Sequence, residues 1–167
     1  VFSDHTLSNN PIIHAQALLQ RAYLQRKLVQ DVNLDDVDHA VSLLEQTQAW
    51  SALASALLDR GRFYIRHRQT KEAYLDFIRA REIFLDTSDD IGVAKVDYEI
   101  ARDMQANGRY LESLEQLESS ALLFKKYSHH EGLARTYQLM IRANSHMARW
   151  SATKEICRNS TELAPHI

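Results

Sequence analysis

The sequence predicts an all-α fold, a right-handed solenoid of about four helical hairpins, and three observations lead to this prediction. Apolar residues recur at helical spacing through most of the chain. The chain contains only four Gly and two Pro, whereas a β-sandwich or barrel needs turn residues about every 8–12 positions. Small residues return at a fixed spacing of 40, in the column formed by Ala40, Ala80, Ser120 and Ser160. A period of about 20–50 residues is typical of stacked-repeat proteins.

Larger residues accompany this column at the same spacing. Three positions earlier stand Val37, Phe77, Leu117 and Cys157, and three positions later stand Leu43, Ile83, Leu123 and Leu163. Small residues let two helices approach, and large residues fill the neighbouring gap, so we expect both columns to be buried. Because Cys157 is the only cysteine, it can form no internal disulfide, and its column predicts a small buried thiol.

The first repeat is expected to follow a short segment without periodicity. Residues 1–10 show no helical spacing and should fray. Asn10 and Pro11 then suit an N-cap and the first helical position, which predicts a helix over about 11–30. A second helix over about 34–47 follows, with three acidic residues near its positive N-terminal end. These are Asp35, Asp36 and Asp38.

Six more helices follow along the chain. The run "DTSDD" breaks one helix and can cap the next, and Asn107-Gly108 suits a left-handed helix end. The expected helices cover about 49–67, 71–86, 90–107, 110–126, 130–147 and 150–163. They pair into repeats of about 11–47, 48–87, 88–127 and 128–164, within a single domain over 11–167.

The third repeat, "IGVAKVDYEIARDMQANGRYLESLEQLESSALLF", resembles a tetratricopeptide repeat. Its small and large residues stand where that family places them, namely Ala101, Met104, Gly108, Tyr110, Ser113, Leu117 and Ser120. The second repeat matches through Gly61, Tyr64, Ala73, Phe77 and Ala80. The fourth repeat departs from the pattern at Ile141 and Asn144, and the first departs at Arg21 and Leu24.

The repeat length indicates a particular branch of this family, because the spacing here is 40 residues, whereas the usual tetratricopeptide period is about 34. Longer repeats with an acidic D-x-x-G-x-A junction, here "DDIGVA", resemble the branch found in kinesin light chains, spindle-orientation adaptors and sensor domains of bacterial regulators. The resemblance implies a noncatalytic module that binds a protein or peptide. We expect it to be the sensory or regulatory segment of a larger bacterial signalling protein, such as a diguanylate cyclase or a transcription regulator. The start at Val1 rather than Met fits a processed or excised piece.

Stacked repeats form a concave surface, and we expect the first helix of each pair to line it. One column of that surface holds Arg62, Arg102 and Arg142. Guanidinium groups bind carboxylates through paired hydrogen bonds, and an aromatic ring supplies rigid contact area. The surface is therefore expected to bind an acidic or carboxylate-bearing segment. The candidate partner-binding residues are Arg62, Arg102, Arg142, Lys95, Arg135, Tyr98, Ile65, Gln105 and Gln138.

Two alternatives stay open at the level of sequence. The repeated arginines can instead pair with Asp or Glu of an adjacent hairpin, or remain solvated. The module can also act by self-association, as a homodimer that controls an attached output domain, because repeat arrays need polar end faces to stay monomeric.

Composition and motifs argue against several other functions. The net charge of −2 creates no general attraction to nucleic acid or to a membrane surface, and no apolar stretch approaches the roughly 18 residues of a membrane span. No P-loop or nucleophile motif occurs, so we expect no catalytic residues and no cofactor. His129, His130 and Glu131 are adjacent, so their side chains diverge and predict no metal site. The cytoplasm is the expected compartment, with the periplasm left open.

Overall fold

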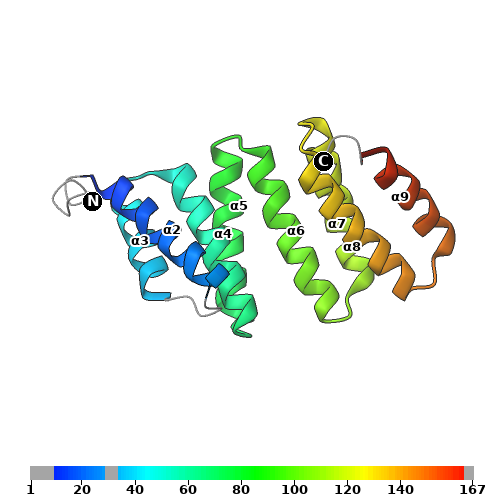
Figure 1. Ribbon diagram of the computed structural model, residues 1–167, viewed down its shortest axis with the longest axis horizontal. Helices are drawn as coiled ribbons and strands as arrows, with labels where there is room; N and C mark the ends of the chain where they lie inside the picture. Colours follow the sequence, from blue (N-terminus) through cyan, green and yellow to red (C-terminus); the bar gives the residue numbers. More distant parts are fainter. Residues whose placement is uncertain (1–9, 29–33, 164–167) are drawn as a thin grey trace. The chain divides into compact units, whose positions relative to one another are not determined.

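The computed structural model describes residues 10–28 and 34–163, and their regular structure is helical (Figure 1). The all-α prediction is therefore confirmed for this part of the chain. The helices in the described ranges are α2 (Pro11–Leu28), α3 (Leu34–Gln46), α4 (Trp50–Arg66), α5 (Thr70–Asp86), α6 (Asp90–Ala106), α7 (Tyr110–Lys126), α8 (His130–His146) and α9 (Trp150–Leu163). The prediction that the N-terminal segment frays falls on residues outside these ranges, except for Asn10.

The helices group into two compact units. The N-terminal unit (Val1–Ser88) contains α2 to α5, and the C-terminal unit (Asp89–Ile167) contains α6 to α9. Within each unit the helices pair as hairpins, α2 with α3 and α4 with α5, then α6 with α7 and α8 with α9. The hairpins stack because α3 packs on α4 and α7 packs on α8. Each unit is thus a pair of stacked helical repeats, the arrangement of an α-solenoid.

The described connections from α3 to α9 share one backbone feature that returns every 20 residues. A residue with positive φ ends the helix in each case, at Gln48, Arg68, Ser88, Gly108, Ser128 and Ala148. At Arg68, for example, the Gln69 N–H donates to Tyr64 O at 2.9 Å and the Arg68 N–H donates to Ile65 O at 3.2 Å. This pair of bonds is the Schellman helix ending. Of these six positions, only one is occupied by glycine, the residue that adopts positive φ without steric cost.

The predicted columns form much of the interior. Phe77 and Leu117 are fully buried, as are Ala40 and Ala80 from the column of small residues. Ser120 keeps its hydroxyl satisfied in the core by donating to Ala94 O of α6 at 2.8 Å. Small side chains at these crossings allow neighbouring helices to pack closely.

The large columns do not follow the prediction throughout, since Leu43, Ile83 and Leu123 are only partly buried. Cys157 of α9 is exposed, so the prediction of a buried thiol is wrong. Ile156, one residue earlier, occupies the core instead, packed with Leu139 and Met140 of α8. The column is buried only where another helix covers it, and no described helix covers this side of α9.

A charged cluster ties three helices of the N-terminal unit together. Arg60 of α4 donates two hydrogen bonds to Asp76 of α5, each at 2.7 Å, and a third to Asp38 of α3 at 2.8 Å. The hydrogen bonds to Asp76 raise the pKa of Arg60, so the guanidinium stays charged in spite of its partial burial. Arg21 of α2 pairs with Asp36 of α3 in the same way.

No described helix is long and apolar enough to cross a membrane.

Candidate functional site

The candidate residues of the C-terminal unit gather around one phenol. Tyr98 on α6 is half-buried, and α6 contacts α8 directly. Burial raises the pKa of Tyr98, and the Glu99 carboxylate adds to the increase, while the positive charges of Arg102, Arg135 and Arg142 oppose it. All three guanidinium groups are therefore close enough to act on the Tyr98 hydroxyl. We call the face formed by Lys95, Tyr98, Arg102, Arg135, Gln138 and Arg142 the α6–α8 surface.

Two of these arginines are paired with carboxylates of their own helices. Arg102 meets Glu99 at 2.7 Å, and the Glu99 side chain is only 4% exposed. Arg135 meets Glu131 at 2.6 Å, where both side chains are more than half exposed. Pairs three or four residues apart on a helix are weak when exposed, typically about 0.3–0.5 kcal/mol. The Arg135 pair is therefore easily exchanged for an external carboxylate.

Arg142 is held by a neutral partner. Its Nε donates to Gln105 Oε1 at 2.8 Å. The Gln105 amide is buried and donates in turn to Ser113 Oγ at 3.0 Å and to Leu139 O at 2.9 Å. Since Gln105 carries no charge, the positive charge of Arg142 stays uncompensated by this bond. The sequence placed Gln105 among the surface residues, whereas the structure places it in the interior, beneath Arg142.

The remaining candidates of this unit are exposed. Lys95 and Gln138 lie on the solvent side of α6 and α8. Within the described ranges Lys95 forms no hydrogen bond or ion pair. The α6–α8 surface thus carries four cations, and the carboxylates near them are those of Glu99, Glu131 and Asp103, which leaves one positive charge in excess. An anionic segment is the complementary partner for such a surface.

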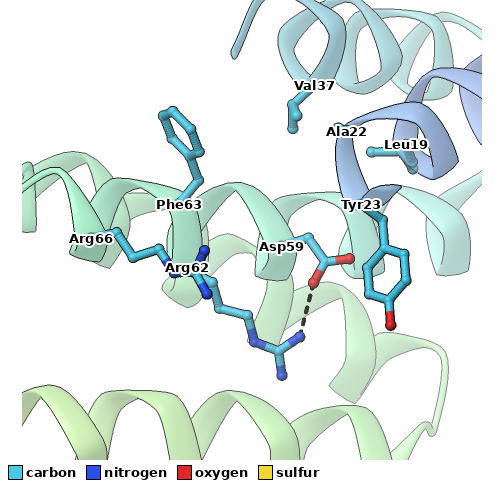
Figure 2. Close-up of a pocket in the computed structure, with 8 residues that line it drawn as sticks. All are labelled: Leu19, Ala22, Tyr23, Val37, Asp59, Arg62, Phe63 and Arg66. Atoms are coloured by element: carbon cyan, nitrogen blue, oxygen red, sulfur yellow. Dashed lines mark hydrogen bonds and ion pairs between the residues drawn. The ribbon is translucent and has the colours of Figure 1, made fainter. Parts of the chain in front are cut away.

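Arg62 and Ile65 belong to the N-terminal unit, on α4. Arg62 pairs with Asp59 at 2.8 Å, and Ile65 is half-buried. Arg62 also lines a pocket between α2, α3 and α4, together with Arg66 (Figure 2). The repeat columns of the sequence did not reveal this pocket, because its lining residues come from three helices and do not recur at the repeat spacing.

His129, considered above as a metal ligand, has a structural role. Its Nδ1 accepts a hydrogen bond from the Gly132 N–H at 3.0 Å and so caps α8. Asp89 caps α6 in the same manner, 40 residues earlier, by accepting from Gly92 N–H at 2.8 Å. Among the residues that the structure describes, no group of three or more His, Cys, Asp or Glu side chains is arranged to hold a metal ion.

The sequence was compared with protein-family models and with curated proteins. No protein-family model matches the chain, and a search of curated proteins found no match.

Proposed function

We propose that the chain is a tetratricopeptide-like interaction module, without catalytic activity, that binds an acidic protein or peptide segment on the α6–α8 surface. The observation that carries the proposal is the bond of Arg142 on α8 to Gln105 on α6, which joins the arginine-bearing helices, with Arg102, Arg135 and Arg142 within electrostatic range of Tyr98. The resemblance of the third and second repeats to that family and the stacked hairpins of each unit support the same proposal.

The paired and unpaired cations have different parts in this binding. Lys95 and Arg142 have no carboxylate partner in the described structure, so they can attract an anionic segment without first breaking an ion pair. Arg135 can leave the exposed Glu131 and form a bidentate bond to an incoming carboxylate. Tyr98 offers an aromatic surface and a phenol hydroxyl that can form hydrogen bonds to the partner. The partner therefore combines acidic side chains with apolar ones that can cover the ring.

The structural explanation of the arginines accounts for only part of the surface. Arg102 is bound to a buried carboxylate, which is the behaviour expected of a stabilising pair. Arg135 forms an ordinary pair within one helix turn. Neither pairing explains why Lys95 and Arg142 add two further positive charges on the same face.

The test uses a fluorescein-labelled peptide of alternating Glu and Leu, with a Lys–Leu peptide as its charge-reversed control, in an anisotropy titration. We expect the parent chain to bind the Glu–Leu peptide, with an affinity that falls as salt is added. Arg102→Glu with Arg142→Glu should weaken binding by at least about 10-fold, because attraction is replaced by repulsion.

The matched control is the double variant Lys154→Glu with Arg158→Glu, which reverses two exposed charges on α9 of the same unit. It changes the net charge by the same amount and should bind nearly as the parent does. Equal losses in the two double variants, or no saturable binding of the Glu–Leu peptide, would contradict the proposal.

We further infer that the module is the regulatory segment of a larger cytoplasmic signalling protein. The support is its resemblance to sensor domains of bacterial regulators, together with the lack of a catalytic motif in the sequence. The sequence of the complete gene product tests this inference. We expect it to contain a cyclase, kinase or DNA-binding domain attached to the repeats. Catalytic activity of the repeats themselves would contradict the inference.

Self-association is the second candidate function, and the exposure of α9 favours it. Trp150 is 62% exposed, and Cys157 is exposed where its equivalents Phe77 and Leu117 are fully buried. A second copy of the chain could cover this face. Sedimentation over a concentration series should then show a dimer that Trp150→Arg disrupts, and mild oxidation should join two chains through Cys157. A monomer at every concentration would exclude this function.

A further inference from the structure

We propose that the pocket of the N-terminal unit is a binding site for a small amphiphilic carboxylate, with its apolar group between α2, α3 and α4 and its carboxylate at Arg66. The pocket lies entirely within the N-terminal unit. The proposal is therefore independent of the α6–α8 surface and of any partner that binds there.

The walls of the pocket are apolar and come from three helices. Leu19 and Ala22 of α2, Val37 of α3 and Phe63 of α4 line it (Figure 2). Ala22 and Val37 are each only 5% exposed, so they belong to the rigid interior. Phe63 is held in turn by stacking on His67, with 4.2 Å between the ring centroids. The apolar part of the site is thus formed before a ligand arrives, which lowers the entropic cost of binding.

The size of the pocket limits the ligand. Its volume is ≈ 50 Å³ and it opens to solvent. Sites for drug-sized molecules are larger, roughly 300–1,000 Å³. A short or branched aliphatic group fits the available space, and the remainder of the ligand then lies at the mouth, in reach of the charged residues there.

The charged residues at the mouth come from successive turns of α4. Arg62 and Arg66 are four residues apart and therefore lie on one face of the helix. Arg62 is bound to Asp59 at 2.8 Å (Figure 2). Arg66, in contrast, forms no hydrogen bond or ion pair with any residue of 10–28 or 34–163. Two cations and one carboxylate leave one positive charge beside an apolar wall, which matches a single carboxylate attached to an apolar group.

The same chemistry occurs in two kinds of ligand, the C-terminal residue of a peptide and a free short-chain carboxylic acid. The experiment separates them with the probes N-acetyl-leucine and hexanoate, and uses N-acetyl-leucinamide as the uncharged control. Each probe is titrated into the ¹⁵N-labelled full chain and followed by two-dimensional NMR. For ligands of this size we expect dissociation constants on the order of millimolar.

The expected result is a set of shifts confined to α2, α3 and α4, with the acids binding at least about 10-fold more tightly than the amide. Tighter binding of N-acetyl-leucine identifies a peptide terminus, and tighter binding of hexanoate identifies a free acid. Equal binding of acid and amide, or shifts located in α6 to α9, would overturn the proposal.

Two variants and one control complete the test. Arg66→Gln should weaken the acids by about 10-fold and leave the amide unchanged. Arg68→Gln removes the same charge two residues later, outside the pocket lining, and should change nothing. Ala22→Leu fills the pocket and should abolish binding of all three probes. If Ala22→Leu does not fold, the comparison of Arg66→Gln with Arg68→Gln still decides: equal behaviour of those two variants overturns the proposal.

Discussion

Gly61 of α4 lies so close to the ring of Phe77 on α5 that a methyl group at position 61 would stand 2.4 Å from Cε1 of the ring. Phe77 is 0% exposed and is surrounded on all sides, so the ring has no space to move into. Glycine is therefore required at position 61 by the close approach of the two helices. This pair connects the two halves of the second hairpin, at the crossing where the sequence predicts one small and one large residue.

Gly61→Ala is expected to destabilise the chain by about 1–3 kcal/mol, the usual effect of overpacking a core. The free energy of unfolding from urea denaturation measures it. The double variant with Phe77→Leu should lose less than the sum of the two single variants, because the smaller side chain makes room for the methyl group. Strict additivity would show that the clash is not the cause.

Phe77→Ala should cost about 3–5 kcal/mol, since it removes a fully buried ring and leaves a cavity. Cys157→Ala, in the same column of the sequence, should change the free energy of unfolding by no more than about 0.5 kcal/mol, because that side chain is exposed. A thermal melt of each variant is sufficient to separate these values. Similar melting temperatures for the two variants would mean that burial does not distinguish the two positions.

Asp103→Asn should stabilise the chain at neutral pH. Burial raises the pKa of the Asp103 carboxyl, and the nearby Arg102, Asn107 and Arg109 lower it less. The folded chain therefore holds this proton more tightly than the unfolded chain, so stability falls as the pH rises from the unfolded pKa, about 3.9, through the folded one. Urea denaturation at pH 7 should show the stabilisation, and it should disappear below pH 4 or so, where both states are protonated.

Asp90→Asn is the control for this prediction, with the opposite sign. Hydrogen bonds from Lys126 and Tyr127 lower the pKa of Asp90, so its contribution to stability is present above the unfolded pKa and is lost as the pH falls. The amide variant should therefore be less stable than the parent at pH 7. A stabilising effect of both amides would indicate a general response to lower negative charge.

Ser128→Gly should stabilise the chain by about 0.5–1 kcal/mol. Ser128 ends α7 with φ at 53°, a left-handed conformation that costs an L-residue about 1–2 kcal/mol. Glycine avoids this cost, but about half of the gain is lost because glycine has more conformational freedom in the unfolded chain. Ser119→Gly, at an exposed position in the middle of α7, should instead destabilise by about 0.5 kcal/mol. Urea denaturation of both variants gives the comparison, and the same sign for both would contradict the conformational explanation.

The sequence predicted the helices well because their period and their ends are local properties. Helix α7 was expected over 110–126 and is observed from Tyr110 to Lys126. The burial of Phe77 also followed from one column. The same rule failed at Cys157, because burial depends on a neighbouring helix that a column of residues cannot supply.

The candidate site was predicted less completely, because side-chain partners are not periodic. Gln105 stood in a surface column, and only coordinates reveal its buried bond to Arg142. The bonds of Arg60 to Asp76 and Asp38 join positions 16 and 22 residues apart, which no repeat register indicates. Tyr98 and Arg102 were predicted together because they share one face of α6.

The helix endings that return every 20 residues have a consequence for how such a chain can change its length. Within each unit, the described junctions direct the next helix by the same backbone bend, whichever amino acid occupies the bend. A duplicated hairpin inserted within a unit therefore has the same kind of junction at both of its ends. Its helices can then pack against their neighbours in the same orientation as the original hairpin. Each unit can therefore gain or lose a whole hairpin without a change in the backbone geometry of its junctions.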